Sequence, residues 1–510
     1  MNFISDYYEQ LLTCDRVMVI LNSEEDLQFT SNLISNLNIK ELIVASEYKK
    51  YLHKIKNKIE DIQNKKNIKI TTVKYKNDEY ISVDDNKKLN SDCNIDAIIF
   101  NKDLNNKQIL SLQEFAPKIL LGKLYFNEVD YYDVWSKFRN FSTGIFLEVI
   151  MPNGKIERVE WEPSDSNIEI SVIFPVYNVE KYLDKCIETV TEWNADYIEF
   201  IFVNDGSPDN SAQKLKKISE VDSRIKVIDK ENGGCASARK LGLENAKGKY
   251  VGFIDPDDFI EPDMFKQLHK RALLGSYQVC YSGYNEYYEN TKNIKRVTND
   301  AIHWPYTEGV RDEREIKKLI MCLRVAIWRG IYLKSMLDEN NITFNENLKR
   351  FDDLPFKIEV FSKAKSVVAV PEYLYYYRLE RPGQDVSCSD ERLYVHFDIF
   401  DYIDDKKEIL QDSITRDYIQ MSKLQTHLYA IQKIDNKYFK TYVKKMKKDM
   451  RKNMKPLRNL IITKAYLGKD KFVKMNMINL GLAKIIKLEQ KIKFNMKKDD
   501  KNILNLKKLY

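Results

Sequence analysis

Between residues 168 and 258, four apolar runs alternate with stretches of helical periodicity, and three of the runs end in a polar turn. Strands that alternate with helices form a parallel sheet with helices on both faces. Functional residues of such a sheet lie at the carboxyl ends of its strands. The runs are EISVIFPVYN (169–178), YIEFIFVNDGS (197–207), RIKVIDK (224–230) and YVGFIDPDD (250–258).

The chain has 510 residues, which is too long for one hydrophobic core. The pattern predicts an N-terminal α/β accessory domain over residues 1–150 and a linker over 151–167. The α/β domain with the four runs would cover 168–388, and a basic α-helical region would cover 389–510. We therefore expect an α/β protein with a mostly parallel catalytic sheet and two accessory regions.

The N-terminal domain has five predicted strands, and helical stretches separate some of them. The first strand continues into LNSEEDLQF, which contains no glycine. A dinucleotide site needs glycines there so that the backbone can approach a pyrophosphate. A structural or partner-docking role is therefore favoured, and the linker predicts a hairpin across Asn153-Gly154. The predicted strands are 16–21, 41–46, 68–73, 96–100 and 118–122.

Composition narrows the function classes. No apolar run approaches the length of about 18 residues that a membrane span needs, and the N-terminus lacks the features of a secretory signal. The seven cysteines form no C-x-x-C pair and the five histidines are isolated, which disfavours a disulfide framework and a zinc site. A cytoplasmic protein is expected.

The polar turns place carboxylates close together. PVYN (175–178), NDGSPDNS (204–211), NGGCASAR (232–239) and DPDD (255–258) would all meet at one edge of the sheet. Each turn taken alone is ordinary. Together they predict a divalent cation, because Mg²⁺ and Mn²⁺ prefer oxygen ligands and are commonly held by carboxylates plus substrate phosphates. Such a cation would neutralise charge on a phosphate leaving group.

These motifs resemble the family 2 glycosyltransferases, which are inverting enzymes of the GT-A fold. VNDGSPDNS resembles their VDDGSxDxS turn. ENGGCASARKLGLENAKGKYVGFIDPDD resembles their NxGxxxARNxGxxxAxGxYxxFxDxDD pattern, with Lys240 where asparagine is usual. The resemblance extends from residue 170 to about 385 and leaves both terminal regions unexplained.

The resemblance implies roles for individual residues. Tyr177 and Glu180 would line the nucleotide pocket, Asp205 would accept a hydrogen bond from the base, and Arg239 would lie near the nucleoside diphosphate. In the D-x-D motif, Asp257 is the expected ligand of Mn²⁺ or Mg²⁺. Asp255 would lie near the ribose and the metal-bound waters, and Asp258 would support the loop or contact the sugar.

An inverting transfer also needs a base for the acceptor hydroxyl. FNENLKRFDDLPF (344–356) resembles the family segment that carries it, which assigns the base to Asp353 and puts Asp352 where glutamate is usual. The alternative is an N-cap of the following helix. Trp328 lies in a segment that resembles the family's W-x-K-x-Y, with Gly330 in place of lysine, and is either packing or a wall of the acceptor pocket.

Two arginines lie in YLYYYRLERPGQDVS (373–387), which loosely resembles the closing loop of the family. Arg378 and Arg381 would contact the diphosphate, or they are surface charges. The C-terminal region is strongly basic, with 28 Lys and Arg against 12 Asp and Glu between 401 and 510. That charge is either a solvated helical face or a contact with the anionic inner leaflet. No nucleic-acid motif is present.

The residues and the resemblance together predict a metal-dependent inverting glycosyltransferase. It would move a hexosyl or N-acetylhexosaminyl group from a nucleotide-diphosphate donor, with UDP-sugars favoured. The acceptor would be a hydroxyl of a surface polysaccharide, such as a capsule, or of a lipid-linked oligosaccharide. The protein would be cytoplasmic or peripheral on the inner face of the membrane. The alternative is a non-catalytic sugar-nucleotide-binding scaffold or sensor in a polysaccharide assembly complex.

Overall fold

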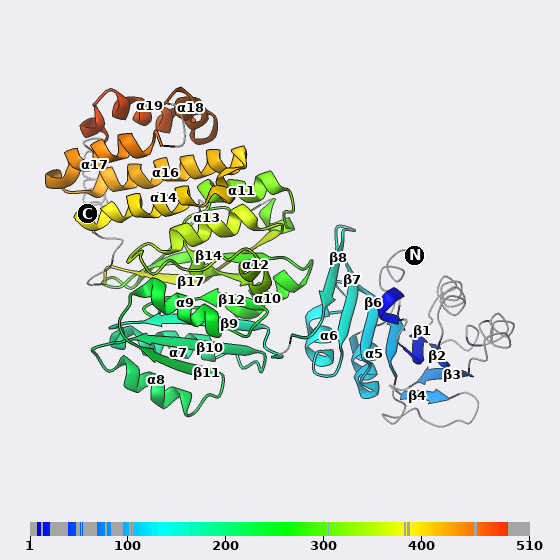
Figure 1. Cartoon of the computed structure of the whole chain (residues 1–510). Helices are drawn as coiled ribbons and strands as arrows, with labels where there is room; N and C mark the ends of the chain where they lie inside the picture. The colour runs from blue at the N-terminus through cyan, green and yellow to red at the C-terminus, as the bar shows by residue number, and fades with distance from the viewer. Residues whose placement is uncertain are drawn as a thin grey trace, which may run out of the picture. The chain divides into compact units, whose positions relative to one another are not determined.

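The computed structural model divides the chain into two compact units (Figure 1). Unit 1 comprises Met1–Asn167 and Lys270–Ser276, and unit 2 comprises Ile168–His269 and Tyr277–Tyr510. The structure describes residues 8–11, 14–20, 39–46, 52, 54, 69–76, 79–82, 95–100, 104, 106–127, 129–164, 166–298, 300–303, 305–381, 384, 388–452 and 456–487.

Unit 1 is built on an eight-stranded sheet with the order β4-β3-β2-β1-β5-β6-β7-β8. The inner strands are parallel, and the pairs β3–β4 and β7–β8 are antiparallel. Helix α6 (Tyr131–Phe138) buries Val134, Trp135 and Phe138, and its N-cap Asp130 accepts a hydrogen bond from the Tyr132 amide. The strands are β1 (Arg16–Ile20), β2 (Glu41–Ser46), β3 (Lys69–Lys76), β4 (Glu79–Ser82), β5 (Ala97–Phe100), β6 (Ile119–Tyr125), β7 (Gly144–Ile150) and β8 (Ile156–Trp161).

All five strands expected in this region are present, and three more complete the sheet. The hairpin is confirmed: β7 and β8 pair across a turn in which Gly154 has a φ of 80°, a left-handed conformation that suits glycine. Strand β8 lies inside 151–167, the predicted linker. Its alternate residues Val159 and Trp161 are buried, so this part of the segment belongs to unit 1. A dinucleotide site of a doubly wound sheet would lie in the crevice after β1 and β5. The residues that follow these strands, 21–38 and 101–103, lie outside the described residues, so the expectation that no such site is present stays a prediction.

Unit 2 contains a sheet in the order β11-β10-β9-β12-β16-β14-β17-β13, with β15 (Asn293–Arg296) beside β14. The first four strands are parallel and correspond to the four predicted runs. Helices α7, α8 and α9 occupy the predicted stretches; in α7, the buried residues Leu183, Cys186, Ile187 and Val190 recur at helical spacing. The bounds are β9 (Ile170–Val176), α7 (Glu180–Thr191), β10 (Ile198–Asp205), α8 (Ser211–Ser219), β11 (Ile225–Lys230), α9 (Cys235–Asn245) and β12 (Tyr250–Phe253).

The second half of this sheet brings a distant strand to the DPDD turn. Strand β17 (Val367–Leu379) runs parallel to β14 (Val279–Tyr288), and β16 (Gly330–Leu333) lies between β14 and β12. The short strand β13 (Phe259–Ile260) follows the turn directly and pairs with Tyr375 and Tyr376 of β17. This pairing places the residues around Tyr375 beside the carboxylates at the end of β12.

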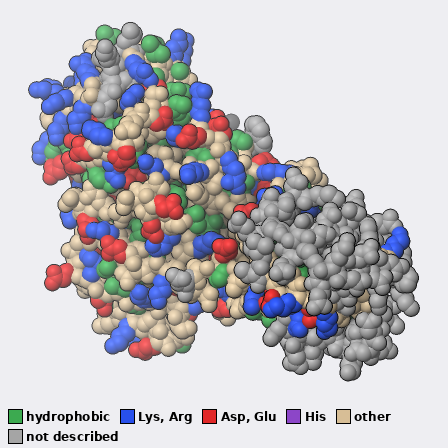
Figure 2. Space-filling model, turned by 45° about the vertical axis from the view of Figure 1, so that its right-hand side comes forward, with side chains coloured by type: hydrophobic (Ala, Val, Ile, Leu, Met, Phe, Trp, Pro, Cys, Tyr) green, Lys and Arg blue, Asp and Glu red, His purple; other side chains and the backbone are tan. Residues whose placement is uncertain are grey.

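The C-terminal region is helical, as expected, and packs as successive layers (Figure 1). Helix α17 buries Phe439, Tyr442 and Met446, and the buried Met450 follows its last turn. Lys and Arg side chains crowd this end of the molecule, at the top of Figure 2. Within the described residues, no helix is both long enough and apolar enough to cross a bilayer. The helices are α14 (Val395–Asp405), α15 (Lys407–Leu410), α16 (Ser413–Lys433), α17 (Asn436–Asp449), α18 (Pro456–Ile462) and α19 (Gly468–Asn479).

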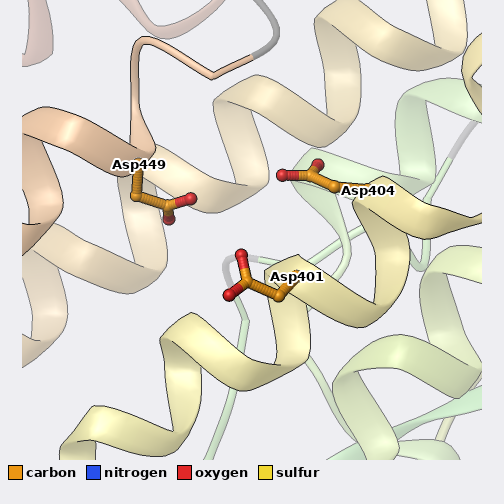
Figure 3. Close-up of side chains that lie close together, drawn as sticks. All are labelled: Asp401, Asp404 and Asp449. Carbon is orange, nitrogen blue, oxygen red and sulfur yellow. The ribbon is translucent and has the colours of Figure 1, made fainter.

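Three carboxylates converge among these helices (Figure 3). Asp401 and Asp404 extend from α14 and Asp449 from α17, close enough together to hold a cation. The cation is supplied by the protein: the buried Lys423 ammonium lies 3.1 Å from both Asp404 and Asp449. His427 adds a contact of 2.9 Å to Asp449, and Lys452 pairs with Asp401. The cluster is therefore an ion-pair network that joins three helices.

Replacing Lys423 with methionine should destabilise this region, because two buried carboxylates lose their counter-ion. Removing one partner of a buried ion pair costs about 3–5 kcal/mol. Urea denaturation followed by circular dichroism at 222 nm measures the loss. The control Lys440→Met changes an exposed lysine of α17 and should leave the midpoint unchanged. Equal midpoints for the two variants would contradict the assignment of Lys423 as the counter-ion.

Candidate functional site

The three carboxylates of the DPDD turn point to three different partners. Asp255 accepts a hydrogen bond of 2.6 Å from the Arg239 guanidinium. Asp258 accepts from the Tyr375 hydroxyl at 2.6 Å and from the Arg378 amide at 2.7 Å. Asp257 forms an ion pair with Arg381. The negative charge at the end of β12 is thus balanced from α9 and from the end of β17, far apart in the chain.

The electrostatics of the turn favour a bound cation. Burial and the neighbouring Asp255 raise the pKa of Asp257, although the Arg381 guanidinium opposes this increase. Burial, followed by the charges of Asp257 and Asp255, raises the pKa of Asp258 well above its usual range. A cation would offset this repulsion, and oxygen ligands of this kind suit Mg²⁺ or Mn²⁺. Asp257 fits as ligand because its only ion-pair partner among the described residues is the partly exposed Arg381.

The two arginines of β17 and the residues after it contact the turn in different ways. Arg378 is 6% exposed, and its Nε donates to the Asp257 carbonyl at 2.6 Å. It also pairs with Glu289, so the surface-charge alternative is wrong for this residue. Arg381 is more exposed and contacts the Asp257 carboxylate itself. Arg378 therefore supports the backbone of the turn, whereas Arg381 faces the position proposed for the metal.

Arg239 connects the turn to the segment that carries the expected base. Its guanidinium is 5% exposed and donates to Asp255 at 2.6 Å and to Asp352 at 2.8 Å. The resemblance places this residue near the nucleoside diphosphate, and in the structure its side chain is occupied by two carboxylates. Arg239 thus fixes the distance between the carboxyl end of β12 and the start of α13 (Asp353–Lys363).

The Asp352–Asp353 pair has two distinct environments. Asp352 is 4% exposed and bound to Arg239, whereas Asp353 is partly exposed. Within the described chain, no cation lies within ion-pair distance of Asp353. Burial, followed by the charge of Asp352, raises the pKa of Asp353 to about 7, although Arg239 acts in the opposite direction. A carboxyl with this pKa suits a general base near neutral pH.

The N-cap alternative holds for position but not for hydrogen bonding, because Asp352 is the N-cap residue of α13. Asp352 precedes the first residue of α13, and its side chain makes no capping hydrogen bond. Its carboxylate instead accepts from Arg239. The preceding residue, Phe351, has a φ of 55°, which is uncommon for an aromatic residue and marks local strain beside the carboxylate pair.

The residues expected around the nucleotide lie at the carboxyl ends of β9 and β10. Tyr177 follows β9 and is 49% exposed. Asp205 ends β10 and accepts hydrogen bonds from the amides of Gly233 and Gly234, both at 2.8 Å, and from Lys230. Glu180 begins α7 and accepts from both the amide and the side chain of Asn210. The sheet therefore brings the polar turns to one edge, and their role toward a base stays a prediction.

Several supporting residues were missed from the sequence. Glu346 accepts from Ser237 at 2.9 Å and pairs with Lys240 at 2.8 Å, so the lysine that replaces the family's asparagine has a partner in the segment before Asp353. Arg329 forms a buried pair with Asp300 at 2.6 Å, next to Gly330. A Cβ at Gly330 would lie 2.8 Å from the Cys280 carbonyl oxygen, so the usual lysine does not fit there.

An aromatic stack lies beside the carboxylates. Trp328 is 6% exposed and stacks on Tyr375 at 4.0 Å and on Tyr377 at 5.4 Å between ring centroids. Tyr375 is the donor to Asp258, and burial raises its pKa well above the usual range, so it stays a hydrogen-bond donor. Trp328 thus packs against the β17 tyrosine that donates to the turn. Neither tyrosine was singled out from the sequence, because β17 is distant in the chain from the turn.

The comparisons agree with this geometry. The model of glycosyl transferase family 2 matches residues 171–330. The glycosyltransferase GlyG of Streptococcus pneumoniae is 30% identical over 221 residues, which cover 41% of this chain and 70% of GlyG. The glycosyltransferase EpsJ of Bacillus subtilis, described as uncharacterized, is 31% identical over 42% of this chain and 62% of EpsJ. The chain belongs to glycosyltransferase family 2.

The fold is also shared with a solved structure. Residues 1–349 of TarS from Staphylococcus aureus, in complex with UDP-GlcNAc, superpose with a TM-score of 0.50 at 19% identity. The match covers 64% of this chain and 92% of that fragment. It supports the GT-A fold predicted from the sequence. The chain spans 62% of EpsJ and 60% of the putative glycosyltransferase EpsH, also of Bacillus subtilis.

Replacing Arg239 with glutamine should destabilise unit 2, because Asp255 and Asp352 lose a shared buried counter-ion. The expected loss is about 3–5 kcal/mol in the free energy of unfolding. Lys240→Gln is the matched control: the adjacent pair with Glu346 is more exposed and should contribute no more than about 1 kcal/mol. Urea denaturation compares the two variants. A loss for Arg239→Gln no larger than the control would contradict its bridging role.

Proposed function

We propose that the protein is an inverting glycosyltransferase that uses a nucleotide-diphosphate sugar as donor. The main support for the proposal is that Arg239 bridges Asp255 and Asp352, the residue directly before Asp353. This bridge holds the partly exposed Asp353 carboxyl, whose pKa is about 7, at a fixed place relative to the DPDD turn. An acid–base residue and a leaving-group site at a fixed separation are what a single displacement needs.

In the proposed reaction, the Asp353 carboxylate accepts the proton of the acceptor hydroxyl. The oxygen forms a bond to the anomeric carbon of the donor sugar from the face opposite the phosphate. The bond between that carbon and the phosphate oxygen breaks, and its electron pair leaves with the nucleoside diphosphate. Displacement from the opposite face inverts the configuration of the anomeric carbon. Tyr177, Glu180 and Asp205 would bind the nucleoside portion.

Asp257 would hold a divalent cation, Mn²⁺ or Mg²⁺, with Asp255 near its water ligands. When bound, that cation neutralises charge on the departing diphosphate. The chain's own part is to present an unpaired Asp257, which requires Arg381 to leave the ion pair seen in the structure. The freed guanidinium would be available to the diphosphate, while Arg378 keeps its contacts with the turn.

The names of the relatives support a donor class and an acceptor class. The TarS fragment was solved with UDP-GlcNAc. A poly(ribitol-phosphate) beta-glucosyltransferase of Bacillus spizizenii is 27% identical over 229 residues. We therefore infer a UDP-sugar donor and a hexosyl or N-acetylhexosaminyl product. The acceptor would be a hydroxyl of a capsular or other envelope polysaccharide, or of a lipid-linked oligosaccharide at the inner face of the cytoplasmic membrane.

Replacing Asp353 with asparagine should lower the transfer rate by about 10²–10⁴-fold, because the base is lost. Donor binding should be unchanged, since Asp353 lies on the acceptor side in this mechanism. Release of UDP from a panel of UDP-sugars with candidate acceptors measures the rate, and calorimetry measures donor binding. Asp338→Asn, an exposed carboxylate, is the control. Wild-type turnover in Asp353→Asn would remove the assigned base, and donor binding without turnover in the wild type would favour a sensor or scaffold.

The raised pKa of Asp353 also predicts how stability depends on pH. Its pKa is about 7 when folded and about 3.9 when unfolded, so folding favours the protonated carboxyl. This contribution is fully present below pH 4 and is lost as the pH rises through 7. Asp353→Asn should therefore raise the melting temperature at pH 8 but not at pH 4. The wild-type transfer rate should rise between pH 6 and 8, and a flat profile in both measurements would contradict the shift.

The pair between Arg381 and Asp257 predicts the behaviour of the metal site without donor. Arg381→Gln should bind Mn²⁺ more tightly than the wild type, because the competing cation is gone. Asp257→Asn should bind it much more weakly. Electron paramagnetic resonance of free Mn²⁺ in a titration reports both affinities without turnover. Weaker Mn²⁺ binding in Arg381→Gln would show that the arginine does not compete for Asp257.

A further inference from the structure

The last described helices expose an unusual number of apolar side chains. Of the eleven large hydrophobic residues exposed in the described chain, five lie between residues 461 and 485. Figure 2 shows hydrophobic side chains beside Lys and Arg at this end of the molecule. The five residues, with their exposed fractions, are Ile461 (60%), Val473 (39%), Leu480 (75%), Leu482 (45%) and Ile485 (46%).

Ile461 lies on α18 and Val473 on α19, and the other three residues follow the end of α19. Met475 and Ile478 of α19 are buried in the core formed with α16 and α17. Val473 and Leu480 lie seven residues apart, two helical turns, on a face that this core does not cover. Between α18 and α19, Leu460, Ile461, Lys464, Ala465 and Phe472 line a groove of about 630 Å³. The α18–α19 face (residues 460–485) is therefore apolar beyond what internal packing uses.

The same face carries positive charge. Between residues 460 and 485 there are five lysines and a single acidic residue, Asp470. Lys464, Lys469 and Lys484 are exposed among the apolar residues. Exposed apolar side chains next to lysines are the pattern of helices that lie in a membrane interface.

The positive charge of the α18–α19 face favours an anionic lipid surface over a second copy of the chain as its partner. A second copy of the chain would bring the same excess of four positive charges against itself, and like charges in contact repel. An anionic lipid surface satisfies both features, since its headgroups attract the lysines and its acyl region accepts the apolar side chains. We propose that the α18–α19 face docks on a bilayer rich in anionic lipid.

The purpose of membrane docking rests on the proposed function, because an enzyme bound to the bilayer would meet a lipid-linked acceptor there. The α18–α19 face lies in the C-terminal helices, outside the residues that contact the DPDD turn. Lipid binding and donor binding can thus be measured separately. A protein that binds donor but not lipid would contradict only the docking proposal, and one that binds lipid but not donor would contradict only the proposed function.

The test is co-sedimentation of the full chain with vesicles of phosphatidylglycerol mixed with phosphatidylcholine, and with vesicles of phosphatidylcholine alone. Binding is expected only with the anionic lipid. Lys464→Glu with Lys469→Glu should weaken it by about 30-fold or more. Ile461→Ser with Leu480→Ser should weaken it by about 10-fold. High salt should reproduce the first loss but not the second, because only the charge contribution is screened.

Matched controls change the same residue types elsewhere on unit 2. Lys216→Glu with Lys217→Glu alters exposed lysines of α8, and Val221→Ser with Ile294→Ser alters two other exposed apolar residues. Both controls should bind as the wild type does. Equal binding to both vesicle types, no binding to either, or equal losses in the controls would overturn the proposal. Light scattering that shows a dimer dissolved by Ile461→Ser with Leu480→Ser would assign the face to a second copy instead.

Discussion

The Arg239 guanidinium is the interaction on which the arrangement of unit 2 depends. It is buried between Asp255, at the end of β12, and Asp352, at the start of α13. Two carboxylates from segments about a hundred residues apart would repel each other without it. Because the guanidinium is planar and rigid, it fixes separation as well as charge. The adjacent Asp353 is partly exposed with a pKa of about 7, and Asp257 pairs with the partly exposed Arg381.

The DPDD turn shows how burial and charge are balanced at such a site. Asp258 is fully enclosed by Tyr375 and the Arg378 backbone and serves the structure of the turn. Asp257 faces Arg381, so a protein cation occupies the place that a metal is proposed to take. The contrast with Asp404 and Asp449 is instructive. There the counter-ion is Lys423, 1% exposed, which makes that cluster a permanent part of the helical core.

The sequence predicted most of what is local. The four strands and three helices from 168 to 258 were expected because period and turn chemistry agree at each step, and the family motifs identified the carboxylates. The contacts of Tyr375, Arg378 and Glu346 were not predicted, because they depend on how β17 and the 345–352 segment return to the sheet. The turn signals and two prolines of residues 151–167 indicate a linker with a hairpin, whereas the pairing of β8 with β7 makes Ile156–Trp161 part of the sheet of unit 1.

A thermal-shift comparison of wild type and Asp257→Asn tests directly whether Asp257 and a divalent cation form the donor site. Each would be mixed with UDP-, GDP- and dTDP-sugars in Mn²⁺ and in EDTA. A ligand at 100 times its dissociation constant stabilises a protein by about 2.7 kcal/mol, which such a scan resolves. We expect one nucleotide class, UDP, to stabilise the wild type only when Mn²⁺ is present, and no nucleotide to stabilise Asp257→Asn. Equal stabilisation in EDTA or in the variant, or no shift with any donor, would contradict this expectation.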